Sequence, residues 1–165
     1  MKRLILIRHS KSSWKDVSLT DFNRPLNGRG KSDGPLMADY LKSKINKIDY
    51  LHSSSSVRTF ETSKYFIKQI QFEKVEYDDS LYHCSATSIL NMIRSYSDNY
   101  QSVMIIAHNP GLTDLINSIT NISLDNLPTT GLAEIVFNIN SWSKISYENS
   151  NICLLYTSPS PRDTD

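Results

Sequence analysis

Two short apolar runs, each ending next to a histidine, constrain this chain most strongly. The first run covers residues 4–7 and stops at Arg8 and His9, and the second covers residues 103–107 and stops at His108. A continuous run of Val, Ile and Leu is typical of a parallel strand that is buried on both faces. Because reactive groups gather beyond the carboxyl ends of such strands, we expect both histidines to face one crevice.

Further strands and helices alternate along the rest of the chain. Strands are expected at 49–52, 74–77 and 133–139, and helices near 29–45, 57–70, 86–97 and 110–119. Alternation of this kind predicts a three-layer α/β/α sandwich with a mostly parallel central sheet. The last strand alternates more than the others, so we expect it at an edge of the sheet.

Local signals predict how three of the helices are oriented and where they begin. In the first helix, Leu36 falls on the expected apolar face, and in the second helix Phe60 does. Ser56 is a suitable N-cap for the second helix. Asn109 is the expected N-cap of the fourth helix, with Pro110 as its first helical residue.

Length, charge and cysteine content set the class of protein. The chain has 165 residues, and we expect a single domain over residues 1–152. Residues 153–165 change sharply in composition and are predicted to be a non-native or disordered tail. A net charge of +1 argues against general binding to nucleic acid or to a membrane, and no stretch is long enough to span one. Two isolated cysteines indicate a reduced, cytoplasmic protein without a zinc site.

Arg8, His9, Arg58 and His108 are the residues we expect to carry chemistry. A planar guanidinium group can bind two oxygens of a phosphoryl group at once. Two arginines would neutralise the charge on those oxygens during transfer. A neutral imidazole can attack phosphorus and form a covalent phosphohistidine. This chemistry requires neither a metal nor another cofactor.

Four motifs in this order resemble those of the histidine phosphatase superfamily, which has the phosphoglycerate-mutase-like fold. They are Ile-Arg-His at 7–9, Arg-Pro-Leu-Asn at 24–27, the Ser-rich segment 54–62 with Arg58, and Ala-His-Asn-Pro-Gly at 107–111. The resemblance covers roughly residues 2–140 and is strongest to the small SixA-type branch, the phosphohistidine phosphatases. The usual Arg-His-Gly signature reads Arg-His-Ser here, a variation accepted in that branch.

The resemblance implies a role for each matching residue. His9 would be the nucleophile, Arg8 and Arg58 would hold the phosphoryl oxygens, and His108 would donate to the same group. Lys11 and Ser12 follow the nucleophile and could add substrate contacts at the rim.

The sequence departs from larger members of the family at the proton donor. The glutamate expected within residues 81–85 is absent, so Asp79, His83 or solvent would have to supply the proton. Asp79 follows a predicted strand, where a turn is its commonest role. Without a strong acid, the site suits cleavage of a P–N bond, because the imidazole that leaves takes its proton from water.

The sequence therefore predicts a metal-independent phosphatase acting through a phosphohistidine intermediate, with phosphohistidine on a protein as its substrate. A small-molecule phosphomonoesterase of the same superfamily is the enzymatic alternative, and a phosphoprotein-binding module is the alternative without catalysis. Trp14 and Tyr82 could wall the pocket or simply pack elsewhere. The oligomeric state stays open, and a monomer is compatible with the sequence.

Overall fold

The chain folds around one six-stranded sheet, seen here in a computed structural model that describes residues 1–157. The strands lie in the order β3-β2-β4-β1-β5-β6. The first four of these are parallel, β5 is antiparallel to β1, and β6 is antiparallel to β5. The strands are β1 (Lys2–Arg8), β2 (Lys47–Ser54), β3 (Gln71–Asp78), β4 (Ser102–Ala107), β5 (Leu132–Phe137) and β6 (Ser150–Tyr156).

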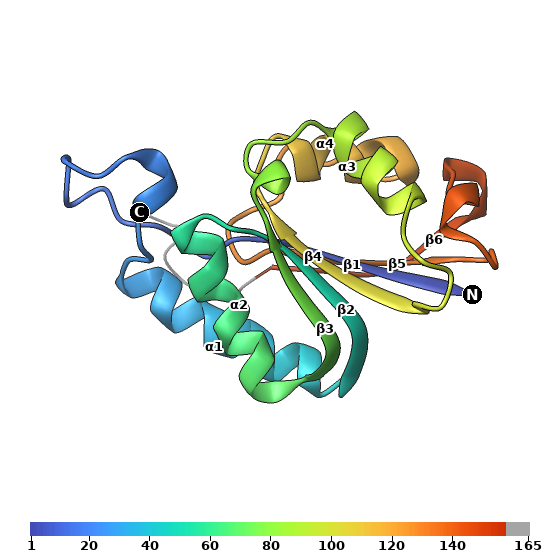
Figure 1. Cartoon of the computed structure of the whole chain (residues 1–165), viewed down its shortest axis with the longest axis horizontal. Helices are drawn as coiled ribbons and strands as arrows, with labels where there is room; N and C mark the ends of the chain where they lie inside the picture. Colours follow the sequence, from blue (N-terminus) through green and yellow to red (C-terminus); the bar gives the residue numbers. More distant parts are fainter. Residues whose placement is uncertain (158–165) are drawn as a thin grey trace.

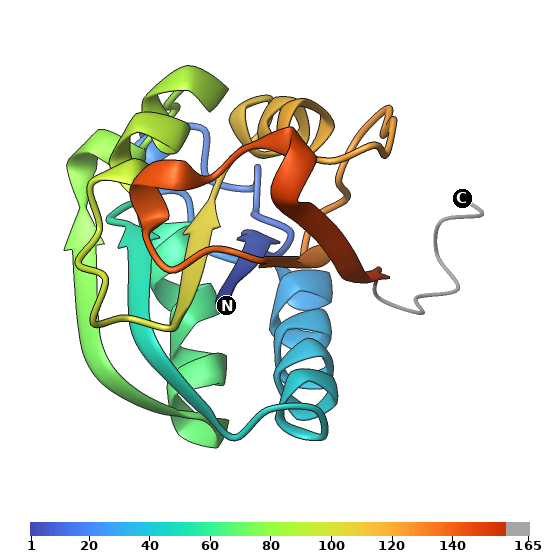
Figure 2. The same cartoon turned by 90° about the vertical axis from the view of Figure 1, so that its right-hand side faces the viewer.

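Two helices cover each face of the sheet (Figures 1 and 2). On one face lie α1 (Gly28–Lys42) and α2 (Val57–Gln69), and on the other lie α3 (Ala86–Arg94) and α4 (Gly111–Ile119). The predicted three-layer α/β/α fold is therefore confirmed. No helix within residues 1–157 is long and apolar enough to cross a membrane.

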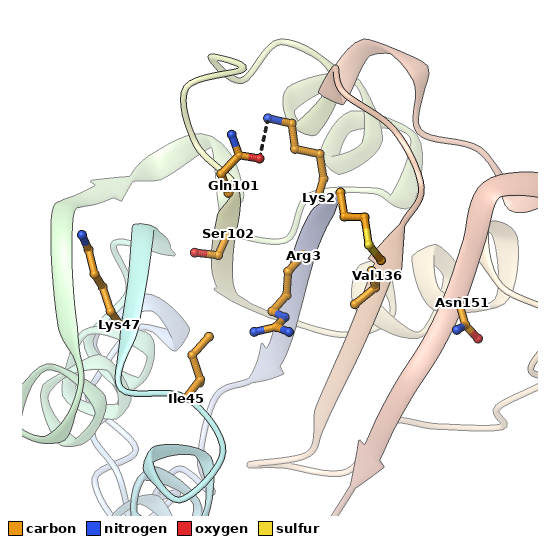
Figure 3. Close-up of a pocket in the computed structure, with 9 residues that line it drawn as sticks. Lys2, Arg3, Ile45, Lys47, Gln101, Ser102, Val136 and Asn151 are labelled. Atoms are coloured by element: carbon orange, nitrogen blue, oxygen red, sulfur yellow. Dashed lines mark hydrogen bonds between the residues drawn. The ribbon is translucent and has the colours of Figure 1, made fainter.

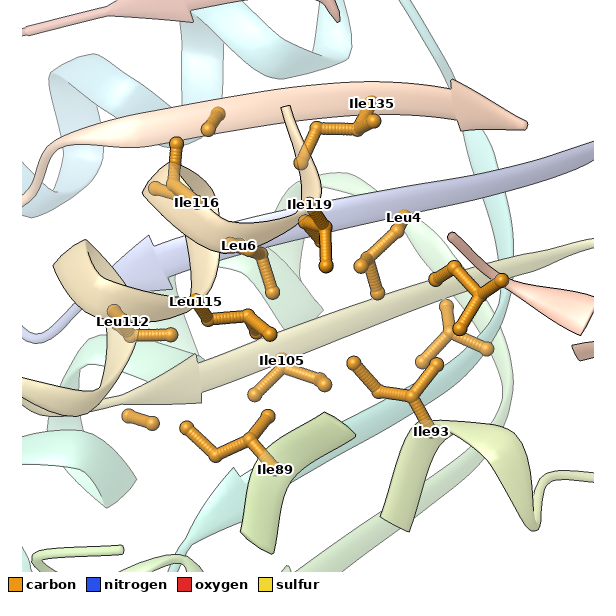
Figure 4. Close-up of a cluster of buried hydrophobic side chains, with 14 of the residues drawn as sticks. Leu4, Leu6, Ile89, Ile93, Ile105, Leu112, Leu115, Ile116, Ile119 and Ile135 are labelled. Carbon is orange, nitrogen blue, oxygen red and sulfur yellow. The ribbon is translucent and has the colours of Figure 1, made fainter. Parts of the chain in front are cut away.

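The central strand β1 explains why its sequence is continuously apolar. Leu4 and Leu6 join the buried cluster under α3 and α4 (Figure 4), while Ile5 and Ile7 join the cluster under α1 and α2. Successive side chains of a strand point to opposite faces, and both faces are covered here. Each of the four is completely buried.

The predicted apolar stripes of α1 and α2 were partly wrong. Leu36 and Phe60 lie on solvent-facing surfaces and are 52% and 41% exposed. In α2 the buried face instead carries small hydroxyl side chains together with Phe66. Thr59 donates to the Ser54 carbonyl at 2.6 Å, and hydroxyls of this kind satisfy the backbone at close range. Polar residues thus face inward where the helix approaches the strand ends.

Helix starts follow the expected signals with one shift. The Ser56 side chain accepts a hydrogen bond from the Thr59 amide, as an N-cap does. The fourth helix begins at Gly111, so Pro110 lies just before the helix and not at its first position. Asn109 still accepts from the Thr113 amide at 3.3 Å. The helix therefore starts one residue later than expected, with Pro110 at the N-cap position.

The expected edge position of the strand at 133–139 was also wrong. β5 lies between β1 and β6, and β6 forms that edge of the sheet. β6 pairs with β5 along its length, as far as Tyr156 opposite Leu132. The Tyr156 ring also stacks on that of Tyr40, with centroids 3.9 Å apart. The expected domain boundary after residue 152 therefore falls inside a strand. The non-native origin of residues 153–165 stays a prediction, and residues 158–165 lie outside the described part.

Candidate active site

The pairing of β1 with β4 brings the two histidines together. Arg8 pairs with Ala107 in the parallel register, so His9 and His108 lie side by side, just beyond the carboxyl ends of two adjacent strands. Their ring centroids are 5.2 Å apart. Arg58 reaches the same point from the first turn of α2, which follows the neighbouring strand β2.

A cavity of about 220 Å³ lies at these carboxyl ends. All six residues predicted from the sequence line it, namely Arg8, His9, Lys11, Ser12, Arg58 and His108. It is also lined by residues to which the sequence assigned no definite role, among them Arg24, Trp14 and His83. The cavity is therefore bordered by three arginines, a lysine and three imidazoles.

His9 is held with its proton on one ring nitrogen and its lone pair on the other. Its Nδ1 lies 2.7 Å from the Ser10 carbonyl oxygen, which can only accept, so Nδ1 carries the proton. Nε2 then has the lone pair, and the Arg58 Nε–H donates to it at 3.3 Å. Burial lowers the pKa of His9 to about 3; the charges of Arg58 and Arg8 add to this effect, and the Ser10 carbonyl opposes it. His9 is neutral at neutral pH and has a nucleophilic Nε2.

His108 lies between a serine and an arginine. Its Nε2 is 2.9 Å from the Ser54 hydroxyl, and its Nδ1 is 3.4 Å from Nη2 of Arg58. Burial, followed by the proximity of His9 and Arg58, lowers the pKa of His108. Because a guanidinium can only donate, Nδ1 accepts from Arg58, so Nε2 carries the proton and donates to the Ser54 hydroxyl.

Arg58 is fixed by a carboxylate that the sequence reasoning missed. Its Nη1 donates to the Asp21 carbonyl at 2.7 Å and its Nη2 to the Asp21 carboxylate at 3.0 Å. Tyr82 and His83 also donate to that carboxylate. Burial raises the pKa of Asp21, but hydrogen bonds from Tyr82, His83 and Arg58 outweigh it and hold that pKa well below its usual range. Asp21 is therefore an anion that orients the surrounding donors.

Asp21 lies in a polar loop with no periodic pattern, in the short 3₁₀ helix Asp21–Asn23. The only sequence signal was its position three residues before Arg24, in a motif already singled out. Arg24 itself is 6% exposed and donates to the Ser12 hydroxyl at 2.7 Å. This bond explains why Ser12 is buried and not simply a rim residue.

Three buried arginine N–H groups at the site lack a hydrogen-bond partner within residues 1–157: Nε of Arg8, and Nε and Nη1 of Arg24. Of these, Nε of Arg24 lies 3.3 Å from the Asp21 carboxylate as an ion pair. An unsatisfied buried donor on a charged group is costly, so structures rarely retain one without a function. Both residues line the cavity. An oxyanion held there would satisfy such donors.

The possible proton donors occupy different places. His83 lines the cavity, with its Nε2 3.0 Å from the Asp21 carboxylate. Its backbone has φ 52°, in the left-handed region that costs energy for a residue other than glycine. Asp79 does not line the cavity; it accepts a hydrogen bond from Ser55.

Trp14 and Tyr82 both lie at the site. Trp14 borders the cavity and stacks on the Arg24 guanidinium at 3.4 Å, although it is 72% exposed. The Tyr82 ring lies edge-on to His108 with centroids 5.3 Å apart. Both aromatic residues therefore contact groups of the site instead of packing into the core.

One group of metal-ligating side chains exists within residues 1–157, away from the cavity. His52, Glu76 and Asp78 place ligand atoms within 4.8 Å of one another. Each is already used internally: His52 bonds Tyr96 and Asp78, and Glu76 accepts from Tyr50. None of the three lines the cavity, so they do not contribute to its chemistry.

A separate hollow of about 560 Å³ lies at the opposite end of the sheet, where β1 and β4 begin (Figure 3). Its lining includes Lys2, Arg3 and Gln101. The Lys2 ammonium is nevertheless committed to the carbonyl oxygens of Asp98 and Tyr100. None of the predicted site residues borders this hollow.

The sheet order and the histidines at the ends of β1 and β4 define a phosphoglycerate-mutase-like α/β protein. The sequence model of the histidine phosphatase superfamily (branch 1) matches residues 4–89, just over half the chain. The chain belongs to the histidine phosphatase superfamily. The resemblance predicted from its motifs is thereby confirmed.

Relatives and solved structures agree with this assignment. An uncharacterized chloroplastic protein of Arabidopsis thaliana is 31% identical over 153 residues, covering 87% of this chain and 70% of the relative. A SixA protein from Agrobacterium tumefaciens superposes with a TM-score of 0.80 at 22% identity, covering 94% of this chain and 97% of the other. The protein histidine phosphatase SixA bound to tungstate gives 0.77 at 18% identity, with the same coverage. These structural matches establish the SixA-type fold, and the family supports a phosphatase activity.

Proposed function

We propose that this protein is a metal-independent phosphatase that forms a covalent phosphohistidine at His9 and acts on phosphohistidine carried by another protein. The observation that carries the proposal is the unprotonated Nε2 of His9 in a cavity that also holds buried N–H groups of Arg8 and Arg24 with no hydrogen-bond partner within residues 1–157. A nucleophile beside unsatisfied cationic donors suits an electrophilic, anionic group. A phosphoryl group has both properties.

In the first step Nε2 of His9 attacks phosphorus, and the bond from phosphorus to the leaving nitrogen breaks. Arg8, Arg24 and Arg58 neutralise the charge spread over the equatorial oxygens. Nδ1 of His9 keeps its proton on the Ser10 carbonyl, which stabilises the positive charge the ring gains. The leaving imidazole takes its proton from water.

In the second step water attacks the phosphorus of phosphohistidine, and the bond to Nε2 breaks. His9 returns to its neutral form and inorganic phosphate leaves. When a phosphoryl group takes the Arg58 N–H in place of Nδ1, His108 can carry its proton on Nδ1 and donate it to a phosphoryl oxygen in both steps, while the Ser54 hydroxyl donates to Nε2. Arg58 keeps its orientation throughout because Asp21 binds two of its nitrogens.

The preference for phosphohistidine rests on the chemistry of the leaving group. Asp21, the carboxylate bonded to Arg58, is ionised and already accepts from Arg58, Tyr82 and His83, so it is a poor proton donor. A proton donor accelerates cleavage of a P–O bond by roughly 10²–10⁴-fold. Cleavage of a P–N bond depends on such a donor far less, because the leaving imidazole can take its proton from water. The cavity also lies beyond the carboxyl ends of β1 and β4 and is lined in part by the exposed residues Trp14 and His83, so a residue on another protein's surface can reach it.

A small-molecule phosphomonoesterase is the second candidate, and one observation favours it. His83 borders the cavity and is hydrogen-bonded to the Asp21 carboxylate, which is the arrangement of an imidazole that shuttles protons. The sequence prediction of a cytoplasmic location stays a prediction.

Labelling tests the covalent mechanism. Incubation with a ³²P-labelled phosphohistidine protein should give an acid-labile, alkali-stable phosphoenzyme in the wild type and none in His9→Ala. A wild type that hydrolyses substrate without ever carrying label would refute the intermediate. Comparing kcat/KM for phosphohistidine protein and a panel of sugar phosphates decides the substrate: higher values for sugar phosphates would favour the second candidate.

A further inference from the structure

A second depression adjoins the cavity of the candidate site on the side of the loop after β1. It measures about 710 Å³ and lies between residues 11–15 and the segment 25–28, with Lys31 of α1 at one end. Lys11, Ser12 and Trp14 line both depressions, so the second depression directly adjoins the cavity of the candidate site. We call it the lysine groove.

The walls of the lysine groove are fixed by backbone contacts. Ser13 donates to the Pro25 carbonyl at 2.8 Å, and Asn27 donates to the Lys11 carbonyl at 3.0 Å. A Cβ atom at Gly30 would lie 2.2 Å from the Lys11 carbonyl oxygen, so only glycine lets α1 approach this closely. The groove is therefore a preformed feature of the fold and not a chance gap between mobile side chains.

The charge of the groove has one sign. Lys11, Lys15 and Lys31 are exposed along it, and no acidic residue lines it. Within the described residues, none of the three ammonium groups forms an ion pair or a side-chain hydrogen bond. By contrast, Lys47 and Lys74 on β2 and β3 pair with glutamates. Unpaired charges of one sign in a hollow attract a partner of the opposite sign.

The rim of the groove has the character of a protein-binding surface. The loop after β1 projects from the body of the molecule at the left of Figure 1. Trp14 is 72% exposed and Val17, on the same loop, is 95% exposed. Exposed aromatic and cationic side chains next to each other are typical of protein interfaces. Asp16, which lies between Trp14 and Val17, is bonded to Ser18, and Asp21 further along the loop is bonded to Arg58; neither lines the groove.

We propose that the lysine groove docks an acidic segment of the substrate protein, next to its phosphorylated histidine. This inference rests on the proposed function and names what the substrate carries beside the phosphoryl group. A phosphohistidine in the cavity places its flanking residues over Lys11 and Trp14, and glutamate or aspartate there meets Lys15 and Lys31. Electrostatic complementarity of this kind raises the association rate and selects the partner.

Two synthetic peptides test the proposal. Both carry one phosphohistidine; one has glutamates on either side of it and the other has glutamines at the same positions. We expect the wild type to show a kcat/KM about tenfold higher for the glutamate peptide at low ionic strength, and a much smaller difference at high salt. Equal values for the two peptides at low salt would overturn the proposal.

Charge reversal supplies the matched comparison. Lys15→Glu/Lys31→Glu should abolish the preference for the glutamate peptide while leaving hydrolysis of phosphoimidazole, which cannot reach the groove, unchanged. Lys42→Glu/Lys68→Glu changes the net charge equally at the far ends of α1 and α2 and should keep the preference. Loss of preference in this control alone or in both variants alike would refute a role for the groove.

A binding measurement separates this proposal from the proposed function. The unphosphorylated glutamate peptide, titrated into the wild type, should shift the NMR amide signals of residues 11–15 and 27–31. Shifts there without hydrolysis of either phosphopeptide would support the groove and refute the phosphohistidine phosphatase. Hydrolysis of both phosphopeptides without such shifts would support the enzyme and refute the groove.

Discussion

The two imidazoles of the candidate site should make the stability of the protein depend on pH. His9 and His108 are buried beside arginines and are neutral in the folded state, with the pKa of His9 near 3. In the unfolded chain an imidazole has a pKa of about 6.5. Below that pH the unfolded state binds protons that the folded state cannot, so folding becomes less favourable as the pH falls.

The size of the effect follows from this difference. At about pH 5.5, roughly nine-tenths of the imidazoles in the unfolded chain are protonated. For each histidine this lowers the free energy of unfolding by about 1.4 kcal/mol relative to pH 7.5. Both together give a loss of about 3 kcal/mol. Carboxylates with a lowered pKa, such as Asp21 and Asp78, add little in this range because they are ionised in both states.

Urea unfolding in phosphate-free buffer at pH 7.5, 6.5 and 5.5 measures this slope. The matched comparison is His9→Gln/His108→Gln, which removes both groups and keeps every other ionisable residue. We expect the double variant to lose about 3 kcal/mol less than the wild type between pH 7.5 and 5.5, whatever its absolute stability. Equal losses in the two proteins would show that the imidazoles are not held neutral by the site.

Three further predictions concern single residues. Arg24→Ala should weaken binding of inorganic phosphate by about 10- to 100-fold in calorimetry, since it removes a buried charged donor; unchanged affinity would exclude that residue from the site. Gly111→Ala should lower the melting temperature, because its Cβ would lie 2.2 Å from the Cys84 carbonyl, whereas Gly28→Ala, with no atom within 4 Å, should not; equal melting temperatures would contradict this. His83→Gln should change phosphohistidine turnover by less than about twofold, whereas a loss of roughly 10²–10⁴-fold would identify it as an essential proton donor.

The sequence predicted the parts of this molecule that depend on uniform local patterns. The strands ending at Arg8 and at Ala107 were recognisable because each is buried on both faces and therefore apolar throughout. The histidines that follow them lie together because the carboxyl ends of adjacent parallel strands lie side by side. The α/β alternation likewise predicted the layers of the fold.

The sequence failed where tertiary contacts override the local pattern. The face of α2 near the site is buried through hydroxyl groups, so apolar spacing pointed to Phe60 instead of Thr59 and Thr62. Asp21 acts from an irregular loop, where no periodicity marks a residue as functional. The position of β5 depended on β6, whose sequence extends into residues excluded on composition.

The pairing of β1 with β4 and β5 also has a consequence for biosynthesis. His9 is synthesised about a hundred residues before His108 and the strand that positions this partner. Contacts so distant in sequence form late and slowly during folding. A chain whose synthesis stops between the two histidines therefore carries His9 without the site we propose, and phosphatase turnover should appear only once β4 and β5 have been made.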